Sequence, residues 1–117
     1  LELLANSWIA AREYDRSLAP LAEAAKLSKD GNLFVRLGQV YMQREKWKEA
    51  TEMLQQGIAK GGVRDLGNAQ LLLGISLYNE QRLDLARSAF ARAREHESTR
   101  EAAERWITHL DGGNGQG

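Results

Sequence analysis

The 117-residue chain contains no cysteine, which excludes disulfides, thiolate metal sites and a cysteine nucleophile but leaves the redox compartment open. No apolar run approaches the ~20 residues that span a bilayer, so no membrane insertion of the visible chain is expected. Neither charge sign is in excess, because lysine plus arginine and aspartate plus glutamate both total 16. No overall field therefore draws the chain to nucleic acid, and nucleic-acid binding is not expected.

The chain has a single proline, Pro20, and no strand-like alternation. Its long stretches are rich in alanine, leucine, glutamate, glutamine, lysine and arginine, which are strong helix formers. The sequence therefore predicts an all-α fold, divided by helix-breaking residues at 28–32, 60–68 and 96–99. Pro20 falls inside a predicted helix, where we expect a kink or a delayed helix start.

The sequence also repeats itself. Aligning Ala5, Gly38 and Gly74 gives steps of 33 (38 − 5) and 36 (74 − 38) residues. The other matched columns are Leu4/Leu37/Leu73, Trp8/Tyr41/Leu77, Tyr14/Trp47/Leu83, Ser17/Ala50/Ala86, Leu21/Leu54/Phe90 and Ala24/Gly57/Ala93. A glycine inside a helix costs roughly 1 kcal/mol relative to alanine, so we interpret Gly38 and Gly74 as close crossing points against the small residues Ala50 and Ala86.

This order of Leu-Gly, tyrosine, small, large and small residues resembles the tetratricopeptide repeat (TPR), a helix-turn-helix unit of about 34 residues. The resemblance implies an all-α, right-handed α-solenoid of antiparallel helix pairs, about three units with a C-terminal capping helix. Residues 1–110 would form the TPR domain, and the glycine-rich residues 111–117 a flexible tail. The expected units are about 1–27, 31–60 and 66–96, followed by a capping helix at about 98–110.

Several positions depart from the TPR pattern. The first unit has Ala5 and Ser17 in the glycine and alanine columns, and the third has Gln70 where a large apolar residue is usual. The closing proline is missing from both linkers. We therefore expect the linkers to be held by Asp30 and Asp65 as N-caps and by Gly61 as a C-cap.

The last predicted helix begins with a capping-box pattern, Ser98 and Glu101. We expect an apolar inner face and a polar outer face, because the end of a solenoid must be soluble. The inner face is Ala102, Ala103, Trp106, Ile107 and Leu110, and the outer face is Glu101, Glu104, Arg105 and Thr108.

Chemistry-bearing patterns are few. The two histidines, His96 and His109, have no partners at ligand spacing, and we expect each to be solvated or near a helix end. The glycine-rich stretch 59–67 lacks the Gly-Lys-Ser/Thr of a phosphate-binding loop, and no serine stands in a nucleophile elbow. We therefore expect no enzyme activity, no metal and no cofactor. A group of arginines is followed by compensating glutamates and is interpreted as a solvated surface: Arg82, Arg87, Arg92 and Arg94.

In a stack of helix pairs the first helix of each pair lines the concave wall, so function is expected on its outward residues. The predicted groove residues are Asn32, Val35, Gln39, Met42, Asn68, Leu71, Ile75 and Tyr78. We expect Ile75 and Tyr78 to form an exposed apolar strip, whereas Leu71 could equally pack on the capping helix. The paired cations with which some TPR proteins hold a C-terminal carboxylate are missing, since Arg36 alone is suitably placed.

Two functions fit these observations. The first is a non-catalytic interaction module that binds a partner peptide or protein segment in the groove through apolar contacts and backbone hydrogen bonds. The alternative is a structural or self-associating solenoid segment that forms a homo-oligomer or part of a larger complex. The chain is helical in register from Leu1, so we expect it to be part of a longer protein. Residues 24–47 and 60–81 also resemble bacterial TPR proteins of the cell envelope, which implies a periplasmic or envelope location.

Overall fold

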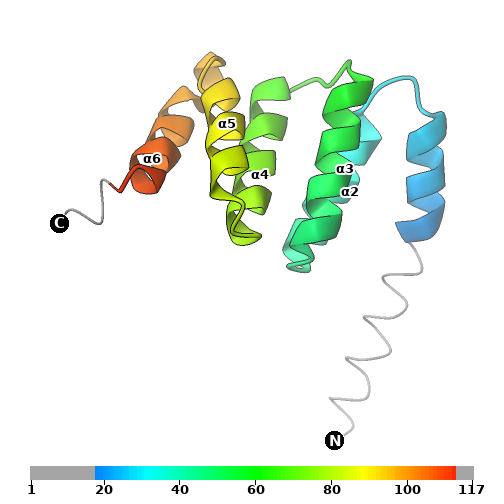
Figure 1. Ribbon diagram of the computed structural model, residues 1–117. Coiled ribbons are helices and arrows are strands. Elements are labelled where there is room, and N and C mark those ends of the chain that lie inside the picture. Colours follow the sequence, from blue (N-terminus) through cyan, green and yellow to red (C-terminus); the bar gives the residue numbers. More distant parts are fainter. Residues whose placement is uncertain (1–17, 113–117) are drawn as a thin grey trace, which may run out of the picture.

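The computed structural model describes residues 18–112, and every regular element in that range is helical, as predicted. Residues 18–27 form a helix, and a 3₁₀ turn, η1 (Glu97–Thr99), precedes the last helix. The other helices are α2 (Asn32–Gln43), α3 (Trp47–Lys60), α4 (Leu66–Asn79), α5 (Leu83–Ala93) and α6 (Arg100–Leu110). Each of these helices packs against the next one in the chain (Figure 1).

The turn between α2 and α3 has the same backbone geometry as the turn between α4 and α5. Glu45 and Gln81, 36 residues apart (81 − 45), both have positive φ, 59° and 63°. Their N–H groups donate to the carbonyls of Met42 and Tyr78, each at 2.9 Å. The next N–H in each turn also donates at 2.9 Å to equivalent carbonyls, from Lys46 to Tyr41 and from Arg82 to Leu77. Positive φ is uncommon outside glycine, so the two helix pairs share an unusual turn geometry.

Gly38 and Gly74 each lie against the second helix of their pair, but their neighbours differ from the prediction. A Cβ on Gly38 would lie 2.7 Å from Cγ of Leu54, and a Cβ on Gly74 would lie 2.5 Å from Cε1 of Phe90. The expected partner Ala50 offers only its carbonyl oxygen, at 3.3 Å from the Gly38 position. The glycines therefore make room chiefly for a large side chain from the partner helix, not for a small one.

Two further glycines, Gly31 and Gly67, lie close to other parts of the chain, Gly31 against backbone and Gly67 against side chains. A Cβ on Gly31 would lie 1.9 Å from the carbonyl oxygen of Gly57, which no side chain can occupy. Gly67, 36 residues after Gly31, is similarly enclosed, with Thr99 Oγ1 2.6 Å and His96 Cβ 2.7 Å from its Cβ position. Gly31 and Gly67 thus both leave no room for a side chain, although their neighbours differ, and the sequence alignment did not single them out.

The helix caps follow the predictions in part. Asp65 is the N-cap of α4, with its carboxylate accepting from Asn68 N–H, and Gly61 at φ 87° is the C-cap of α3. Asp30 is not the cap of α2, because Gly31 takes that position, although the Asp30 carboxylate still accepts from Asn32 N–H at 3.0 Å.

The predicted Ser98/Glu101 capping box is wrong. Thr99 is the N-cap of α6, and its hydroxyl donates to the Ala93 carbonyl at 2.7 Å instead of capping the helix. Thr99 stands one residue after the predicted cap Ser98, and its hydroxyl reaches the end of the preceding helix α5. This hydrogen bond stabilises the connection between α5 and α6. Serine at 98 is left exposed.

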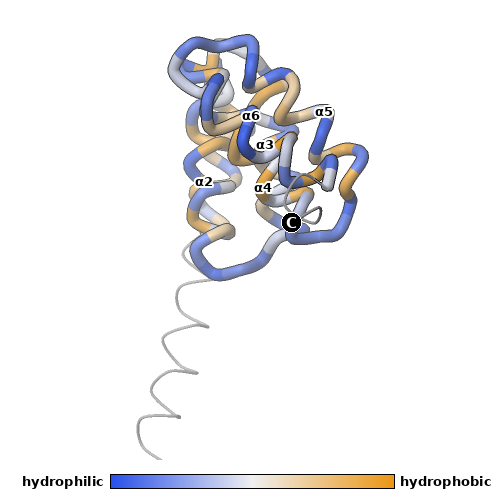
Figure 2. Tube along the Cα trace, turned by 90° about the vertical axis from the view of Figure 1, so that its left-hand side faces the viewer, coloured by the Kyte–Doolittle hydropathy of each residue, from blue (hydrophilic) through white to orange (hydrophobic). Residues whose placement is uncertain are grey.

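Apolar side chains form two clusters that follow the stacking of the helices. One joins residues 18–27 to α2 through Leu18, Ala25, Phe34 and Leu37. The other runs from α3 to α6 through Leu54, Leu73, Leu77, Ala86, Ala89, Phe90 and Ile107. In α6 the predicted inner face is buried or half-buried and the outer face is exposed. In Figure 2 the turns are mainly hydrophilic, and the hydrophobic positions lie within the helices.

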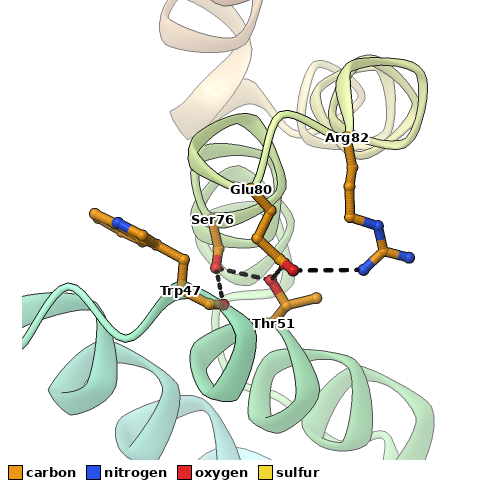
Figure 3. Close-up of polar contacts among 5 residues, drawn as sticks. All are labelled: Trp47, Thr51, Ser76, Glu80 and Arg82. Carbon is orange, nitrogen blue, oxygen red and sulfur yellow. Dashed lines mark hydrogen bonds and ion pairs between the residues drawn. The ribbon is translucent and has the colours of Figure 1, made fainter.

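A polar network joins α3 to α4 in an otherwise apolar interface (Figure 3). The Thr51 hydroxyl, 2% exposed, donates to the Glu80 carboxylate and lies 2.8 Å from Ser76 Oγ. Ser76, 0% exposed, donates to the Trp47 carbonyl at 2.8 Å, and Arg82 lies 3.7 Å from Glu80. Buried hydroxyls need such partners, so the network fixes how one helix pair sits on the next.

Some predictions fall on residues that the structure does not describe. The first half of the first unit, with Ala5, Trp8 and Ser17, lies outside residues 18–112. Residues 18–27 are helical, Pro20 included. Of the expected tail, only Asp111 and Gly112 are described.

Candidate binding groove

The eight predicted groove residues lie on α2 and α4 at matching positions. On each helix they are spaced i, i+3, i+7 and i+10, which places them along one face. The two helices also contact each other, although α3 separates them in sequence. Gln39 is exposed, and the other seven side chains are half-buried.

The structure brings half of these residues together around one cavity. Asn32, Val35, Gln39 and Asn68 line a cavity of about 400 Å³ at the N-terminal ends of α2 and α4. The remaining lining residues come from α2 and from the two loops beside it: Ser28, Asp30, Leu33, Arg36, Val63, Arg64 and Asp65.

Asn32 holds the α3–α4 loop in place at one side of this cavity. Its amide nitrogen donates to the Gly62 carbonyl at 3.2 Å, and its amide oxygen accepts from Arg64 N–H at 3.0 Å. These bonds hold the α3–α4 loop beside α2 and place Val63 and Arg64 in the cavity lining, which the sequence analysis missed. The signal that could have indicated them is the Gly-Asn pair that recurs at 31–32 and 67–68.

Of the charged side chains that line the cavity, the two aspartates have hydrogen-bond partners, whereas the two arginines form no ion pair with a described residue. The carboxylates of Asp30 and Asp65 each accept a backbone N–H at 3.0 Å at the start of a helix. Arg36 and Arg64 have exposed side chains, and neither forms an ion pair with any residue in the range 18–112. The cavity therefore presents two guanidinium groups and the Gln39 amide beside the apolar side chain of Val35. Such a surface can hydrogen-bond to carbonyl and carboxylate oxygens.

Tyr78 belongs to a second, more aromatic hollow of about 350 Å³. Its other lining residues all come from one face of α6: Ala102, Arg105, Trp106 and His109. The Tyr78 hydroxyl lies 2.9 Å from His109 Nε2, and the Tyr78 and Trp106 rings meet edge to face at 5.1 Å. Trp106 in turn stacks on Phe90 at 5.0 Å. His109, expected to be solvated or near a helix end, is exposed in the last turn of α6 but also contacts Tyr78.

The expected exposed apolar strip on α4 is not present. Ile75 and Tyr78 are half-buried, and both pack against the larger core cluster together with Met42 and Leu71. Met42, Leu71 and Ile75 line neither hollow. More apolar side chains of α4 thus pack in the core than the repeat pattern requires. One reason is that α6 places an aromatic side chain beside Tyr78.

Two of the four arginines at α5, Arg82 and Arg87, lie beside carboxylates, whereas Arg92 and Arg94 have exposed side chains. Arg87 makes a paired contact with Asp111, with Nε to Oδ1 at 2.8 Å and Nη2 to Oδ2 at 2.9 Å, and Arg82 lies beside Glu80. The hydrogen bond from Arg87 lowers the pKa of Asp111 below its usual range, and the same bond raises the pKa of Arg87. The pair ties the end of α6 to α5 in solvent.

Within residues 18–112, no helix is long and apolar enough to cross a membrane. The same part of the chain has no group of three or more histidine, aspartate or glutamate side chains arranged to hold a metal ion. In comparisons with known proteins, the chain matches no family model, no curated protein and no solved structure.

Proposed function

We propose that this chain is a TPR-like, right-handed solenoid that acts as a non-catalytic interaction module, binding a partner peptide or protein segment on the face formed by α2 and α4. The repeat is supported by the two equivalent turns at Glu45 and Gln81 and by the equivalent glycine contacts at Gly38 and Gly74. A repeated helix pair places equivalent outward residues side by side, which is how such stacks make extended binding surfaces.

The observation that carries the binding proposal is the 400 Å³ cavity between the two helix starts. It combines an apolar contact at Val35 with hydrogen-bonding side chains at Gln39 and Asn68 and with two guanidinium groups that lack ion-pair partners among the described residues. An extended peptide offers backbone carbonyls at regular spacing, and an acidic side chain or C-terminus would pair with Arg36 or Arg64.

A random peptide library displayed on phage tests this proposal, because the partner need not be known. Peptides selected on the folded chain should lose at least about tenfold in affinity for the Arg36→Glu variant, since a charge-assisted hydrogen bond contributes about 1.5–3 kcal/mol. Fluorescence anisotropy of the labelled peptides measures this loss. Arg36 is exposed, so the substitution should leave the helical circular-dichroism signal unchanged.

The matched control is Lys48→Glu, which makes the same charge change on an exposed position of α3. Selected peptides should bind this variant as they bind the unmodified chain. An equal loss of affinity in both variants would mean that the effect comes only from the change in net charge. Selected peptides that bind all three chains equally would rule out the cavity as the binding site.

Self-association is the second candidate, and it is favoured by two exposed leucines near the start of α5, Leu83 and Leu85. Sedimentation of the chain over a range of concentrations separates the candidates. If the chain is a monomer at all concentrations, self-association is ruled out. A dimer that Leu85→Glu converts to a monomer would support it.

A further inference from the structure

The pair of residues Asp111 and Gly112 follows the last turn of α6 and is chemically reactive by its sequence. An aspartate before a glycine can close a succinimide ring, because the glycine has no side chain to hinder the approach of its backbone nitrogen to the carboxyl carbon. A C–N bond forms, and the carboxyl hydroxyl leaves as water with the proton of the nitrogen. Water then opens the ring at either carbonyl, giving aspartate or isoaspartate, whose main chain runs through Cβ and Cγ.

The backbone of this pair is held in a conformation that opposes ring closure. The Gly112 N–H donates to the His109 carbonyl at 3.1 Å, and the Asp111 N–H donates to the Ile107 carbonyl at 2.8 Å. Ring closure needs the Gly112 nitrogen to lie on the same side as Asp111 Cβ about the Cα–C bond. The ψ angle of Asp111 is 7°, so this nitrogen is instead nearly eclipsed with the nitrogen of Asp111. The attacking atom is therefore turned away from the carboxyl carbon.

The carboxylate that would be attacked is held as well. Arg87 binds both of its oxygens, with Nε to Oδ1 at 2.8 Å and Nη2 to Oδ2 at 2.9 Å. The hydrogen bond from Arg87 also lowers the pKa of Asp111, so less of the neutral carboxyl is present, and only the neutral form can release its hydroxyl as water. Ring closure therefore requires the side-chain pair to separate and the end of α6 to change its backbone conformation.

We propose that Asp111 is a site of spontaneous conversion to isoaspartate and that Arg87 protects it, so that the reaction proceeds only when the end of α6 leaves α5. Isoaspartate cannot restore the same contact, because its free carboxylate is attached directly to Cα and its main chain is one carbon longer. The reaction thus turns a reversible opening of this joint into a permanent one. This inference rests on the geometry of the joint and does not depend on the proposed function.

Incubation of the full chain at neutral pH, followed by proteolytic peptide mapping, measures the reaction. The isoaspartate peptide has the same mass as the aspartate peptide and a different retention time. All chains carry Asn114→Gln, because the Asn-Gly pair at 114–115 closes the same kind of ring and would add products to the same peptide. In this background Arg87→Gln should form isoaspartate about two- to fivefold faster, since exposed ion pairs shift an equilibrium by about this factor.

The matched control is Arg92→Gln, which makes the same charge change at another exposed position of α5 and should leave the rate unchanged. Circular dichroism should give the same helical signal for all three folded chains. The full chain unfolded in guanidinium chloride should react at least about fivefold faster than the folded chain, because unfolding releases both reacting groups. Equal rates in the three folded chains would overturn the role of Arg87. An unfolded chain that reacts no faster than the folded one would overturn the proposal as a whole.

Hydrogen exchange of the isoaspartate form, separated by chromatography, tests the consequence for the joint. Amides in the last turn of α6 should exchange faster than in the unmodified chain, whereas amides of α4 should exchange at the same rate, because only the contact at the end of α6 is lost. Unchanged exchange in α6 would overturn the inference that the reaction opens this joint.

Discussion

Gly74 shows how tightly a single residue can be specified in this molecule. Three atoms of the Phe90 ring lie between 2.5 and 2.8 Å from the position of a Cβ on Gly74, and Phe90 is itself fully buried. The ring cannot withdraw, because Trp106 stacks on it. The glycine is thus required by the side chain opposite it and not by its own backbone conformation.

Gly74→Ala should therefore destabilise the chain by about 1–3 kcal/mol, as overpacked cores do, although alanine at an open helix position would stabilise by about 1 kcal/mol. Urea unfolding followed by circular dichroism measures the difference. A leucine in the equivalent pair still lies 2.7 Å from the Cβ position of Gly38, so the test of the collision is Phe90→Ala. The double variant Gly74→Ala with Phe90→Ala should cost less than the sum of the two single changes, because alanine lacks the ring atoms that collide. A stabilised Gly74→Ala variant would contradict the close crossing.

Gln70 is the opposite case, a residue that fits its position poorly. It is 5% exposed, and its Oε1 has no hydrogen-bond partner among the described residues. The repeat places it in the column of Phe34, which is buried against apolar side chains.

Gln70→Leu should raise the free energy of unfolding by about 1–3 kcal/mol, because it removes a buried acceptor that has no donor. The reverse change in the equivalent position, Phe34→Gln, should lower it. Thermal and urea unfolding of both variants measure the two effects. If Gln70→Leu lowered stability, the amide would have a partner that compensates its burial.

At the scale of helices, the sequence predicted most elements and the placement of the large residues. Matched columns of glycine and large apolar residues located α2 to α5, because helix packing depends on local spacing. The sequence did not indicate the Thr51–Ser76–Glu80 network, since its members are far apart in the chain and belong to no repeat column. The cavity was predicted in part: Gln39 and Asn68 follow from helix periodicity, but Arg64 enters only through the loop that Asn32 holds.

The joint between α5 and α6 should depend on pH through Asp111. Its pKa is lowered in the folded chain by the hydrogen bond from Arg87, so the contribution to stability is present above the usual aspartate pKa of about 3.9. It is lost as the pH falls through the lower pKa of the folded state. Asp111→Asn should lower the melting temperature slightly at pH 7 and have no effect near pH 2.

Arg87→Gln is the control for this prediction, because it removes the same pair from the other side. It should reproduce the pH dependence of Asp111→Asn, and the double variant should add nothing further. Both groups lie in solvent, so high salt should also reduce the difference at pH 7. A difference that persists at pH 2 would show that Asp111 acts through its shape and not through its charge.

At the scale of the whole molecule, stability should be greatest in the middle of the stack. α4 contacts α2, α3 and α5, whereas α6 packs mainly on α5. In stacked repeats each element depends on its nearest neighbours, so terminal elements open at lower free energy than central ones. Native-state hydrogen exchange should show amides of α4 exchanging at least about tenfold more slowly than those of α6. Equal exchange rates would mean that the stack unfolds only as a single unit.

The matching turns at Glu45 and Gln81 have a consequence for how the length of this chain can change. Deleting residues 46–81 would join one turn to the other at the same point, leaving a shorter stack with Gly38 facing Phe90. A shorter deletion or insertion inside a helix would instead rotate the later side chains of that helix away from their contacts. The 36-residue segment is therefore a cassette whose removal or duplication keeps both the turns and the glycine contacts in register.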